Sequence, residues 1–302
     1  GQLLYKVKIQ PLYKQHKISL IMPSYNDAGT IVESLDAIRT QKYSNWELII
    51  VDDGSTDDTK NIVQSYIRQY SLNGKIRYLY ETNSDQLNAI KFGSKFITGD
   101  YVNIIHSDDT FYDNEVLNRA NTKMSLDNVD GILVDLNKVN VRNESLGVQR
   151  TTDYLGDKRQ LKIQALWLGR NLFVDVAFWK KEIFLKQVTD NYLTWNTPNW
   201  IDLNLSRFKT LNFENSGFKC INYRVYEDNY INSEVGNLNV LNGELRTLIS
   251  LLSQYCVPLY KLQYRIFRLF NKLKLLSIYW PVAFRRSTPK QLIGEIVPYV
   301  IS

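Results

Sequence analysis

Short apolar runs alternate with amphipathic segments over the first third of the chain. Four runs have the length and composition of buried strands: 18–22, 46–51, 75–80 and 101–105. Three segments carry apolar residues every three or four positions, which is typical of helices packed on a sheet: 30–41, 56–70 and 84–98. This alternation predicts an α/β fold with a Rossmann-like, mostly parallel sheet and helices on both faces. We expect Pro23 to end the first strand.

The pattern is looser further along the chain. Residues 131–139 have the composition of one more strand, and residues 195–208 suggest a loop that leads into a helix. Toward the C-terminus the apolar spacing is helical throughout. The sequence therefore predicts one domain over residues 17–235, followed by a basic helical extension over residues 236–302.

The composition is that of a globular protein, since 44% of the 302 residues are hydrophobic. Cys220 and Cys256 are the two cysteines, and they form no CxxC motif, so neither a disulfide framework nor a cysteine metal site is indicated. The first ten residues lack the apolar run of a secretory signal, and no run approaches the roughly 20 apolar residues of a membrane-spanning helix. We therefore expect a cytoplasmic protein.

The net charge of +6 comes from one segment near the C-terminus. Residues 245–294 contain nine Lys or Arg and no Asp or Glu, and within them residues 259–286 combine an apolar stripe with basic positions at helical spacing. Three interpretations stay open: a helix packed on the rest of the protein, an interfacial helix at the inner face of the cell membrane, and a homo-oligomer interface. Nucleic-acid binding fits this charge but has no support elsewhere in the chain, so no nucleic-acid partner is expected.

Three polar clusters follow predicted strands, and the first is Pro23-Ser24-Tyr25-Asn26. The ring of Tyr25 can stack on a base, and the amide of Asn26 offers donors and acceptors. An ordinary strand-to-helix turn would account for the same residues. Ligands of parallel α/β sheets bind at the carboxyl ends of strands, which is where this cluster falls.

The second cluster contains two adjacent carboxylates, Asp52 and Asp53, followed by Gly54. Adjacent carboxylates are costly unless donors pair with them, and a uracil ring and a ribose supply N–H and O–H donors. Gly54 permits a tight turn. Capping of the next helix explains one of the two acids. We therefore favour ligand binding for this pair.

The third cluster is His106-Ser107-Asp108-Asp109, directly after the strand expected at 101–105. A carboxylate at this place can hold Mg²⁺ or Mn²⁺, which prefer oxygen ligands and commonly share them with a diphosphate. A polar strand-end loop is the alternative. A lone histidine in this position is more often a hydrogen-bonded structural residue than a metal or ribose ligand.

Taken together, these motifs resemble those of the family 2 glycosyltransferases with a GT-A fold. The likeness is carried by PSYN at 23–26, VDDGSTD at 51–57 and the run SDQLNAIKFGSKFITGDYVNIIHSDDT at 84–110, which is similar to the bacterial surface-polysaccharide branch. The resemblance implies a nucleotide-binding half over residues 17–115 and an acceptor half over residues 116–235.

The resemblance also implies roles for particular residues. Asp108 would bind Mn²⁺ or Mg²⁺, with help from His106, which stands where many family members have Asp. The nucleotide-sugar would be contacted by ten residues: Pro23, Tyr25, Asn26, Asp52, Asp53, Asn83, Asn88, Lys91, Ser107 and Asp109.

An inverting transfer needs a general base to take the proton of the acceptor hydroxyl. In the family this base is usually an acid at the start of a helix, well past the metal motif. Asp202 is the only acid between Asp190 and Glu214, so it is our candidate, although it would equally cap the following helix. The Glu-Asp pair usual in the family is absent here.

The function implied is transfer of a sugar from a UDP-sugar donor to a hydroxyl of a bacterial surface polysaccharide or glycoprotein glycan. The acceptor would be a lipid-linked oligosaccharide or a glycoprotein. A non-catalytic sugar-nucleotide-binding scaffold is one alternative, because the Glu-Asp pair is missing. A nucleotidyltransferase is another, but it would need a glycine-rich, basic loop after the first strand, and residues 23–30 contain no Lys or Arg.

Overall fold

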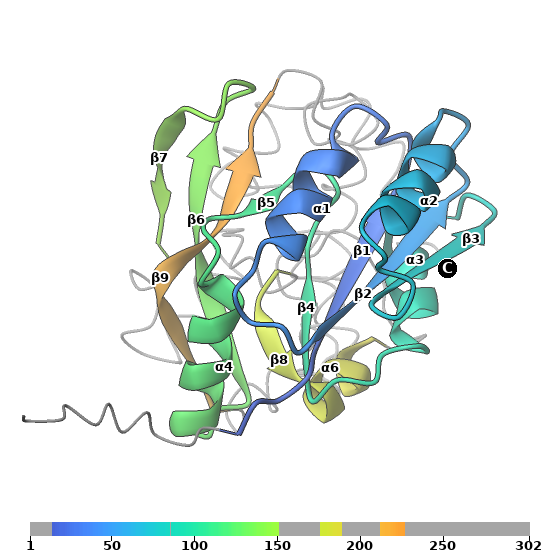
Figure 1. Ribbon diagram of the computed structural model, residues 1–302. Helices are drawn as coiled ribbons and strands as arrows, with labels where there is room; N and C mark the ends of the chain where they lie inside the picture. The colour runs from blue at the N-terminus through green and yellow to red at the C-terminus, as the bar shows by residue number, and fades with distance from the viewer. Residues whose placement is uncertain (1–13, 85, 151–175, 189–211, 227–302) are drawn as a thin grey trace, which may run out of the picture.

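The computed structural model describes residues 14–84, 86–150, 176–188 and 212–226 (Figure 1). Its first half alternates four parallel strands with three helices, as the sequence predicts. The strands are β1 (Ile18–Ser24), β2 (Trp46–Asp53), β3 (Ile76–Glu81) and β4 (Tyr101–Ile104). The helices are α1 (Ile31–Arg39), α2 (Thr59–Gln69) and α3 (Gln86–Ser94).

The second half extends the same sheet with shorter and more irregular elements. Its strands are β5 (Thr110–Phe111), β6 (Gly131–Val139), β7 (Ser145–Gln149), β8 (Phe178–Lys180) and β9 (Phe213–Arg224). Its helices are α4 (Val116–Leu126) and α6 (Lys181–Gln187). The prediction for residues 131–139 is confirmed by β6.

The strands form one sheet in the order β3-β2-β1-β4-β8-β6-β9-β5, and β7 pairs with β6. The pairs β1–β2, β1–β4, β2–β3 and β6–β9 are parallel, whereas β8, β5 and β7 each join antiparallel neighbours. The sheet is therefore mixed, and mostly parallel only in its first half. The sequence analysis did not single out the antiparallel strands β5, β7 and β8, because they are short and give weak sequence signals.

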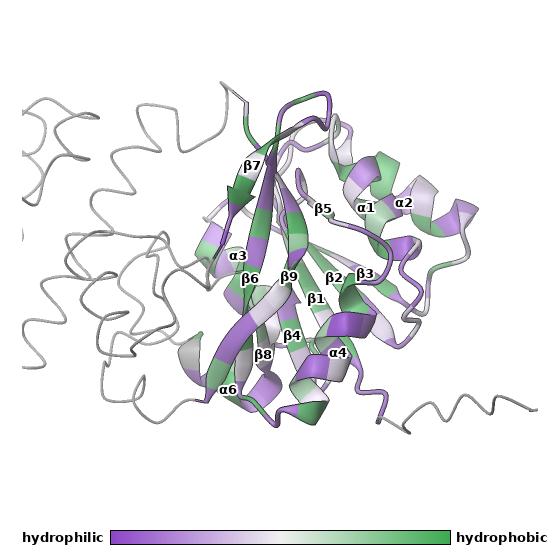
Figure 2. Ribbon diagram, turned by 90° about the vertical axis from the view of Figure 1, so that its left-hand side faces the viewer, coloured by the Kyte–Doolittle hydropathy of each residue, from purple (hydrophilic) through white to green (hydrophobic). Residues whose placement is uncertain are grey.

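Helices cover both faces of this sheet, as expected (Figures 1 and 2). Leu20 and Met22 of β1 pack in one buried cluster with side chains of α1, α2 and α4. Ile21 faces the opposite way and joins a second cluster with side chains of α3 and α6. Burial on both faces explains why β1, β2 and β4 are nearly continuous apolar runs.

Pro23 does not end β1, which continues to Ser24 beside β2. The carbonyl of Ile21 accepts a hydrogen bond from the amide of Ile105, so residue 21 faces β4. Pro23 lies two residues further and faces the same side, beyond the last residue of β4. The missing N–H of proline therefore breaks no hydrogen bond between strands.

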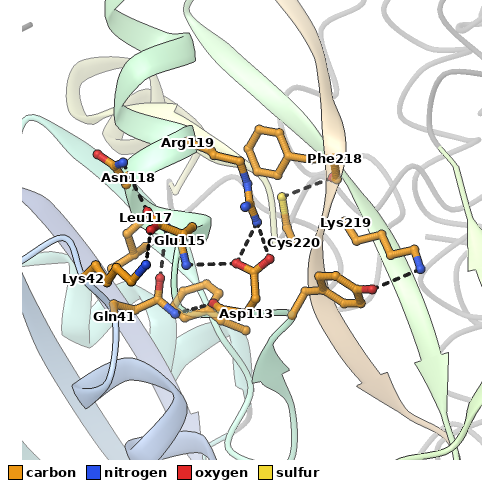
Figure 3. A network of polar contacts seen from close by, with 12 residues as sticks. Gln41, Lys42, Asp113, Glu115, Leu117, Asn118, Arg119, Phe218, Lys219 and Cys220 are labelled. Carbon is orange, nitrogen blue, oxygen red and sulfur yellow. Dashed lines mark hydrogen bonds and ion pairs between the residues drawn. The ribbon is translucent and has the colours of Figure 1, made fainter. Parts of the chain in front are cut away.

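A polar network holds the start of α4 against α1 and β9 (Figure 3). The side chain of Gln41 donates to the carbonyl of Asp113 at 2.6 Å and accepts from the amide of Leu117 at 3.1 Å. Asp113 binds the guanidinium of Arg119 at 2.7 and 2.9 Å, and Arg119 lies over the ring of Phe218. These contacts fix the segment that follows the acidic motif at residues 106–109.

Several sequence predictions lie outside the described residues. They are the helix at 195–208, the candidate base Asp202, the extension at 236–302 and the amphipathic segment at 259–286. Within the part of the chain that the structure describes, no helix has the length and apolar character needed to cross a bilayer. Cys220 is a free thiol buried in β9, and this burial raises its pKa above the usual range.

Candidate functional site

The parallel strands β1, β2, β3 and β4 end at the same edge of the sheet, and the polar motifs follow these ends. In the register of the strands, Ser24 lies beside Asp52, and Asp53 lies beside Glu81. The three motifs separated in sequence therefore meet at one edge, as the strand pattern predicts.

Asn26 connects the first motif to the second. Its side-chain oxygen accepts hydrogen bonds from the backbone amides of Thr56 at 2.8 Å and Asp57 at 3.3 Å. Its backbone amide donates to Oγ of Ser55 at 2.8 Å. Its φ of 56° lies in the left-handed region, which Asn tolerates better than most residues. The side chain of Tyr25 beside it is 50% exposed. Asn26 thus holds the loop after β2 against the end of β1, and the ring of Tyr25 is exposed at this edge of the sheet.

Both carboxylates of the second motif have donors within the chain. Asp52 is fully buried and accepts hydrogen bonds from the amide of Ser55 at 2.7 Å and from the hydroxyl of Tyr78. Burial, and then the hydrogen bond to Asp52, raises the pKa of Tyr78, so this hydroxyl stays a donor. Asp53 accepts from the amide of Ser84 at 2.8 Å.

These contacts correct one step of the sequence argument. Helix capping alone left one of the two acids unexplained, but Tyr78 and Ser84 supply internal donors that the strand pattern did not reveal. The pairing of Asp52 and Asp53 therefore does not by itself require a ligand. Direct contact between Asp52 and a nucleobase stays a prediction.

Gly54 lets the loop after β2 approach the end of β3. Its φ is 81°, and a Cβ at this position would lie 2.8 Å from the backbone nitrogen of Asn83. Asn83 is exposed, and Asn88 donates from α3 to the carbonyl of Ser84 at 3.4 Å. Lys91 lies partly buried on α3. The close approach of Gly54 thus brings the loop after β2 against Asn83, just beyond the end of β3.

The third motif is a tight turn. The amide of Asp109 donates to the carbonyl of His106 at 3.2 Å, so that Ser107 and Asp108 form the tip. The side-chain nitrogen Nε2 of Gln86, in the first turn of α3, lies 2.8 Å from Nδ1 of His106. This contact supports a hydrogen-bonded structural role for His106, while its role as a metal ligand stays a prediction.

Asp27 joins the first motif to the third, and the sequence analysis passed over it. Its Oδ2 accepts hydrogen bonds from Ser24 Oγ and from the amide of Tyr25, both at 2.8 Å, and from Ser107 Oγ. Burial, together with the nearby charge of Asp108, raises the pKa of Asp27 against the effect of these donors. The available signal was its position: an acid directly after PSYN, at the end of a buried strand.

Asp109 is 1% exposed and holds the turn to other elements. Its Oδ1 accepts from the backbone amide of Arg224 at 2.9 Å, and its carbonyl accepts from Ser34 Oγ at 2.6 Å. Burial, and then the charge of Asp108, raises the pKa of Asp109. These contacts give Asp109 a structural role, whereas its contact with a donor sugar stays a prediction.

Asp108 is partly exposed, and the hydroxyl of Tyr226 donates to its Oδ2 at 2.9 Å. Among the described residues, no three His, Cys, Asp or Glu side chains gather as a metal-binding group. Asp108 nevertheless raises the pKa of both Asp27 and Asp109, which marks a local concentration of negative charge. This corner fits a divalent cation that takes one carboxylate from the protein and its other oxygens from a ligand and water.

Comparison with known proteins decides the family. The sequence model of the family described as "Glycosyl transferase family 2" matches residues 19–226, which is more than half of the chain. The chain belongs to this family of glycosyltransferases. The matched region ends at Tyr226 and contains all three motifs.

Curated relatives of this family 2 chain match part of its length. An uncharacterized glycosyltransferase of Rickettsia typhi is 36% identical over 116 residues, which are 38% of this chain and 35% of that protein. The glycosyltransferase GlyG of Streptococcus pneumoniae is 34% identical over 100 residues, which are 33% of this chain and 32% of that protein. The chain therefore spans only about a third of the length of these two relatives.

Solved structures show the same fold. S. aureus TarS 1–349 in complex with UDP-GlcNAc has a TM-score of 0.54 at 18% identity, over 79% of this chain and 72% of TarS. The mannosyltransferase PcManGT of Pyrobaculum calidifontis, in complex with GDP-Man and Mn²⁺, has a TM-score of 0.54 at 15% identity, over 93% of this chain and 86% of PcManGT. The GT-A fold expected from the motifs is confirmed.

Proposed function

We propose that this chain transfers a sugar from a UDP-sugar to a hydroxyl group, with inversion at the anomeric carbon. The meeting of the three motifs at one edge of the sheet, linked through Asn26 and Asp27, is the observation that carries this proposal. The choice of a UDP-sugar as donor is further supported by the TarS complexes with UDP and UDP-GlcNAc, whereas PcManGT binds GDP-Man.

In this proposal the nucleoside lies against the ends of β1 and β2. The exposed ring of Tyr25 stacks on the base, as aromatic side chains commonly do on nucleobases. Asn26 and Asp52 contact the nucleoside and also hold the surrounding loops in place. Asp53 and Asn83 lie close by. Further contacts come from the remaining residues expected from the resemblance: Pro23, Asn88, Lys91, Ser107 and Asp109.

Asp108 would hold Mn²⁺ or Mg²⁺ beside the donor diphosphate, with His106 nearby. Such a cation, when bound, supplies positive charge that stabilises the leaving diphosphate. Asp27 holds Ser107, and Asp109 holds the end of β9, so that the turn presents the Asp108 carboxylate in one orientation. Gln86 orients the ring of His106.

Asp202 stays our candidate for the general base that takes the proton of the acceptor hydroxyl. The acceptor that we propose is a bacterial surface polysaccharide or glycoprotein glycan, with the basic segment at 259–286 contacting the membrane surface. Replacement of Asp202 by Asn, with UDP release measured in the presence of acceptor, tests the base. Turnover equal to that of the unmodified protein would show that another group removes the proton.

Binding of the donor can be tested before the acceptor is known. We expect UDP-sugars to raise the melting temperature more than GDP- or dTDP-sugars, and Mn²⁺ to increase the shift. Asp108→Asn should remove the Mn²⁺-dependent part, while Asp127→Asn, an exposed and distant change at the end of α4, should retain it. Absence of a shift with every sugar nucleotide would contradict the proposed function.

A further inference from the structure

Tyr226 reaches the acidic motif from a distant part of the chain. It lies just beyond β9, and its hydroxyl donates a hydrogen bond to Oδ2 of Asp108 at 2.9 Å. The two residues are 118 positions apart. No sequence motif singled out Tyr226, because it follows a strand with an irregular pattern. Its contact falls on the carboxylate to which the proposed function assigns the divalent cation.

The end of β9 is held in place by contacts on several sides, which fixes where Tyr226 begins. Asn222 pairs with Thr110 of β5, directly after the acidic turn. The amide of Arg224 donates to Asp109, and the guanidinium of Arg224 pairs with Glu33 of α1. The amide of Val225 donates to the carbonyl of the last residue of β6 at 2.8 Å. These contacts thus hold Tyr226 in a fixed position beside Asp108.

The hydrogen bond from Tyr226 makes the two oxygens of the Asp108 carboxylate different. Oδ2 accepts from Tyr226, and this bond fixes the plane of the carboxylate. A cation that chelated both oxygens would share Oδ2 with the hydroxyl of Tyr226, and this hydrogen bond lowers the negative charge that Oδ2 offers to a cation. A cation bound through Oδ1 alone would leave the hydrogen bond intact.

We propose that Tyr226 is a positioning residue that makes Asp108 a one-oxygen metal ligand and thereby disfavours Ca²⁺ relative to Mn²⁺. This inference rests on the proposed function, which places the cation at Asp108. Ca²⁺ takes six to eight oxygens in flexible geometry and binds carboxylates through one or both oxygens. Smaller divalent cations with octahedral geometry accept one oxygen from each carboxylate, with the remaining sites filled by phosphate and water.

The test is Tyr226→Phe in the full chain, which retains the ring and removes only the hydroxyl. Mn²⁺ binding is measured by electron paramagnetic resonance in the presence of UDP, and Ca²⁺ is then added as a competitor. We expect the ratio of the Ca²⁺ to the Mn²⁺ dissociation constant to fall by about fivefold or more, because Oδ2 of Asp108 no longer shares its charge with the hydroxyl and chelates a cation more strongly. The melting temperature without metal verifies that the variant is folded.

Tyr112→Phe is the matched control, since Tyr112 lies on the connection after β5 and its hydroxyl contacts Lys219 at 3.3 Å. It should leave the ratio as in the unmodified protein. A ratio within about twofold of the unmodified value in Tyr226→Phe would overturn the inference alone. An unmodified protein that binds no Mn²⁺ with UDP present would overturn both the inference and the metal site of the proposed function.

Discussion

The carboxylate of Asp109 accepts a hydrogen bond at 2.9 Å from the backbone amide of Arg224, which is 115 positions further along the chain. Both residues are buried. The bond joins the turn after β4 to the end of β9, and so connects the half of the chain with the recognisable motifs to the half without them. Asp109 is therefore an anchor of the site, whatever its contact with a ligand.

Asp109→Asn is expected to retain the fold, because the amide oxygen of Asn can accept the same hydrogen bond and the repulsion from Asp108 is removed. Asp109→Ala leaves the buried amide of Arg224 without its acceptor, and should lower the free energy of unfolding by about 1–3 kcal/mol. Urea unfolding of the two variants checks the difference. Equal loss of stability in both would show that the charge of Asp109, rather than its hydrogen bond, is what the fold requires.

Gly131 at the start of β6 is required by the ring of Trp179 on the neighbouring strand β8. A Cβ at Gly131 would lie 2.2 Å from a ring carbon of Trp179. Gly131→Ala should therefore destabilise the protein by about 1–3 kcal/mol through overpacking. Gly74→Ala is the control, since a Cβ there meets nothing within 4 Å. Thermal unfolding of both variants tests this, and equal melting temperatures would contradict the packing argument.

Gln41 connects α1 to α4 through hydrogen bonds with the backbone groups of Asp113 and Leu117 (Figure 3). Gln41→Leu removes both bonds and leaves the buried amide of Leu117 unpaired, so we expect a loss of about 1–3 kcal/mol in unfolding free energy. Gln69→Leu, at the exposed end of α2, should change it by less than about 0.5 kcal/mol. Chemical denaturation measures both, and similar values would show that the network contributes little.

Glu47 should make the stability depend on pH in the acid range. Burial alone would raise its pKa, but hydrogen bonds from Lys17, Ser19 and Thr98 outweigh burial and lower the pKa to about 2. Because the folded state lowers the pKa, this stabilisation is present above pH 4.5 and is lost as the pH falls toward 2. The loss should amount to about 2–3 kcal/mol.

Urea unfolding of Glu47→Gln between pH 7 and pH 2 checks this prediction. The variant should be less stable than the unmodified protein at pH 7, and the two should converge as the pH falls. The exposed residue Glu182 on α6 provides a control substitution, Glu182→Gln, which should keep the pH dependence of the unmodified protein. Parallel curves for Glu47→Gln and the unmodified protein would contradict the assignment.

Tyr25 should contribute to nucleotide affinity and little to stability, because half of its surface is exposed. Tyr25→Ala is expected to weaken UDP binding by about 5- to 100-fold, the usual effect of losing a base-stacking ring. Tyr25→Phe keeps the ring and should bind almost as well as the unmodified protein. Tyr70→Ala, at the far end of α2, should leave UDP affinity unchanged. Titration calorimetry decides, and unchanged affinity in Tyr25→Ala would remove the stacking interaction from the proposal.

The first half of the chain was predictable because β1, β2 and β4 are buried on both faces. Continuous apolar runs such as 46–51 then mark strands clearly. β9 gave no such signal: buried positions such as Asn215 and Ser216 are polar, Gly217 has a φ of 74°, and the register with β6 shifts twice. These irregularities break the alternation on which strand prediction depends.

The sequence by itself determined the local elements of the first half, the three motifs and the edge of the sheet at which they meet. These follow from periodicity and from residue types close together in the chain. Only the tertiary structure decided which donor pairs with which carboxylate. Tyr78 reaches Asp52, Ser107 reaches Asp27 and Tyr226 reaches Asp108 across distances in sequence that the order and register of the strands set. The sequence shows that these carboxylates need hydrogen-bond donors, because each lies in a polar motif at the end of a buried strand. Which donors they receive depends on how segments far apart in the chain pack together.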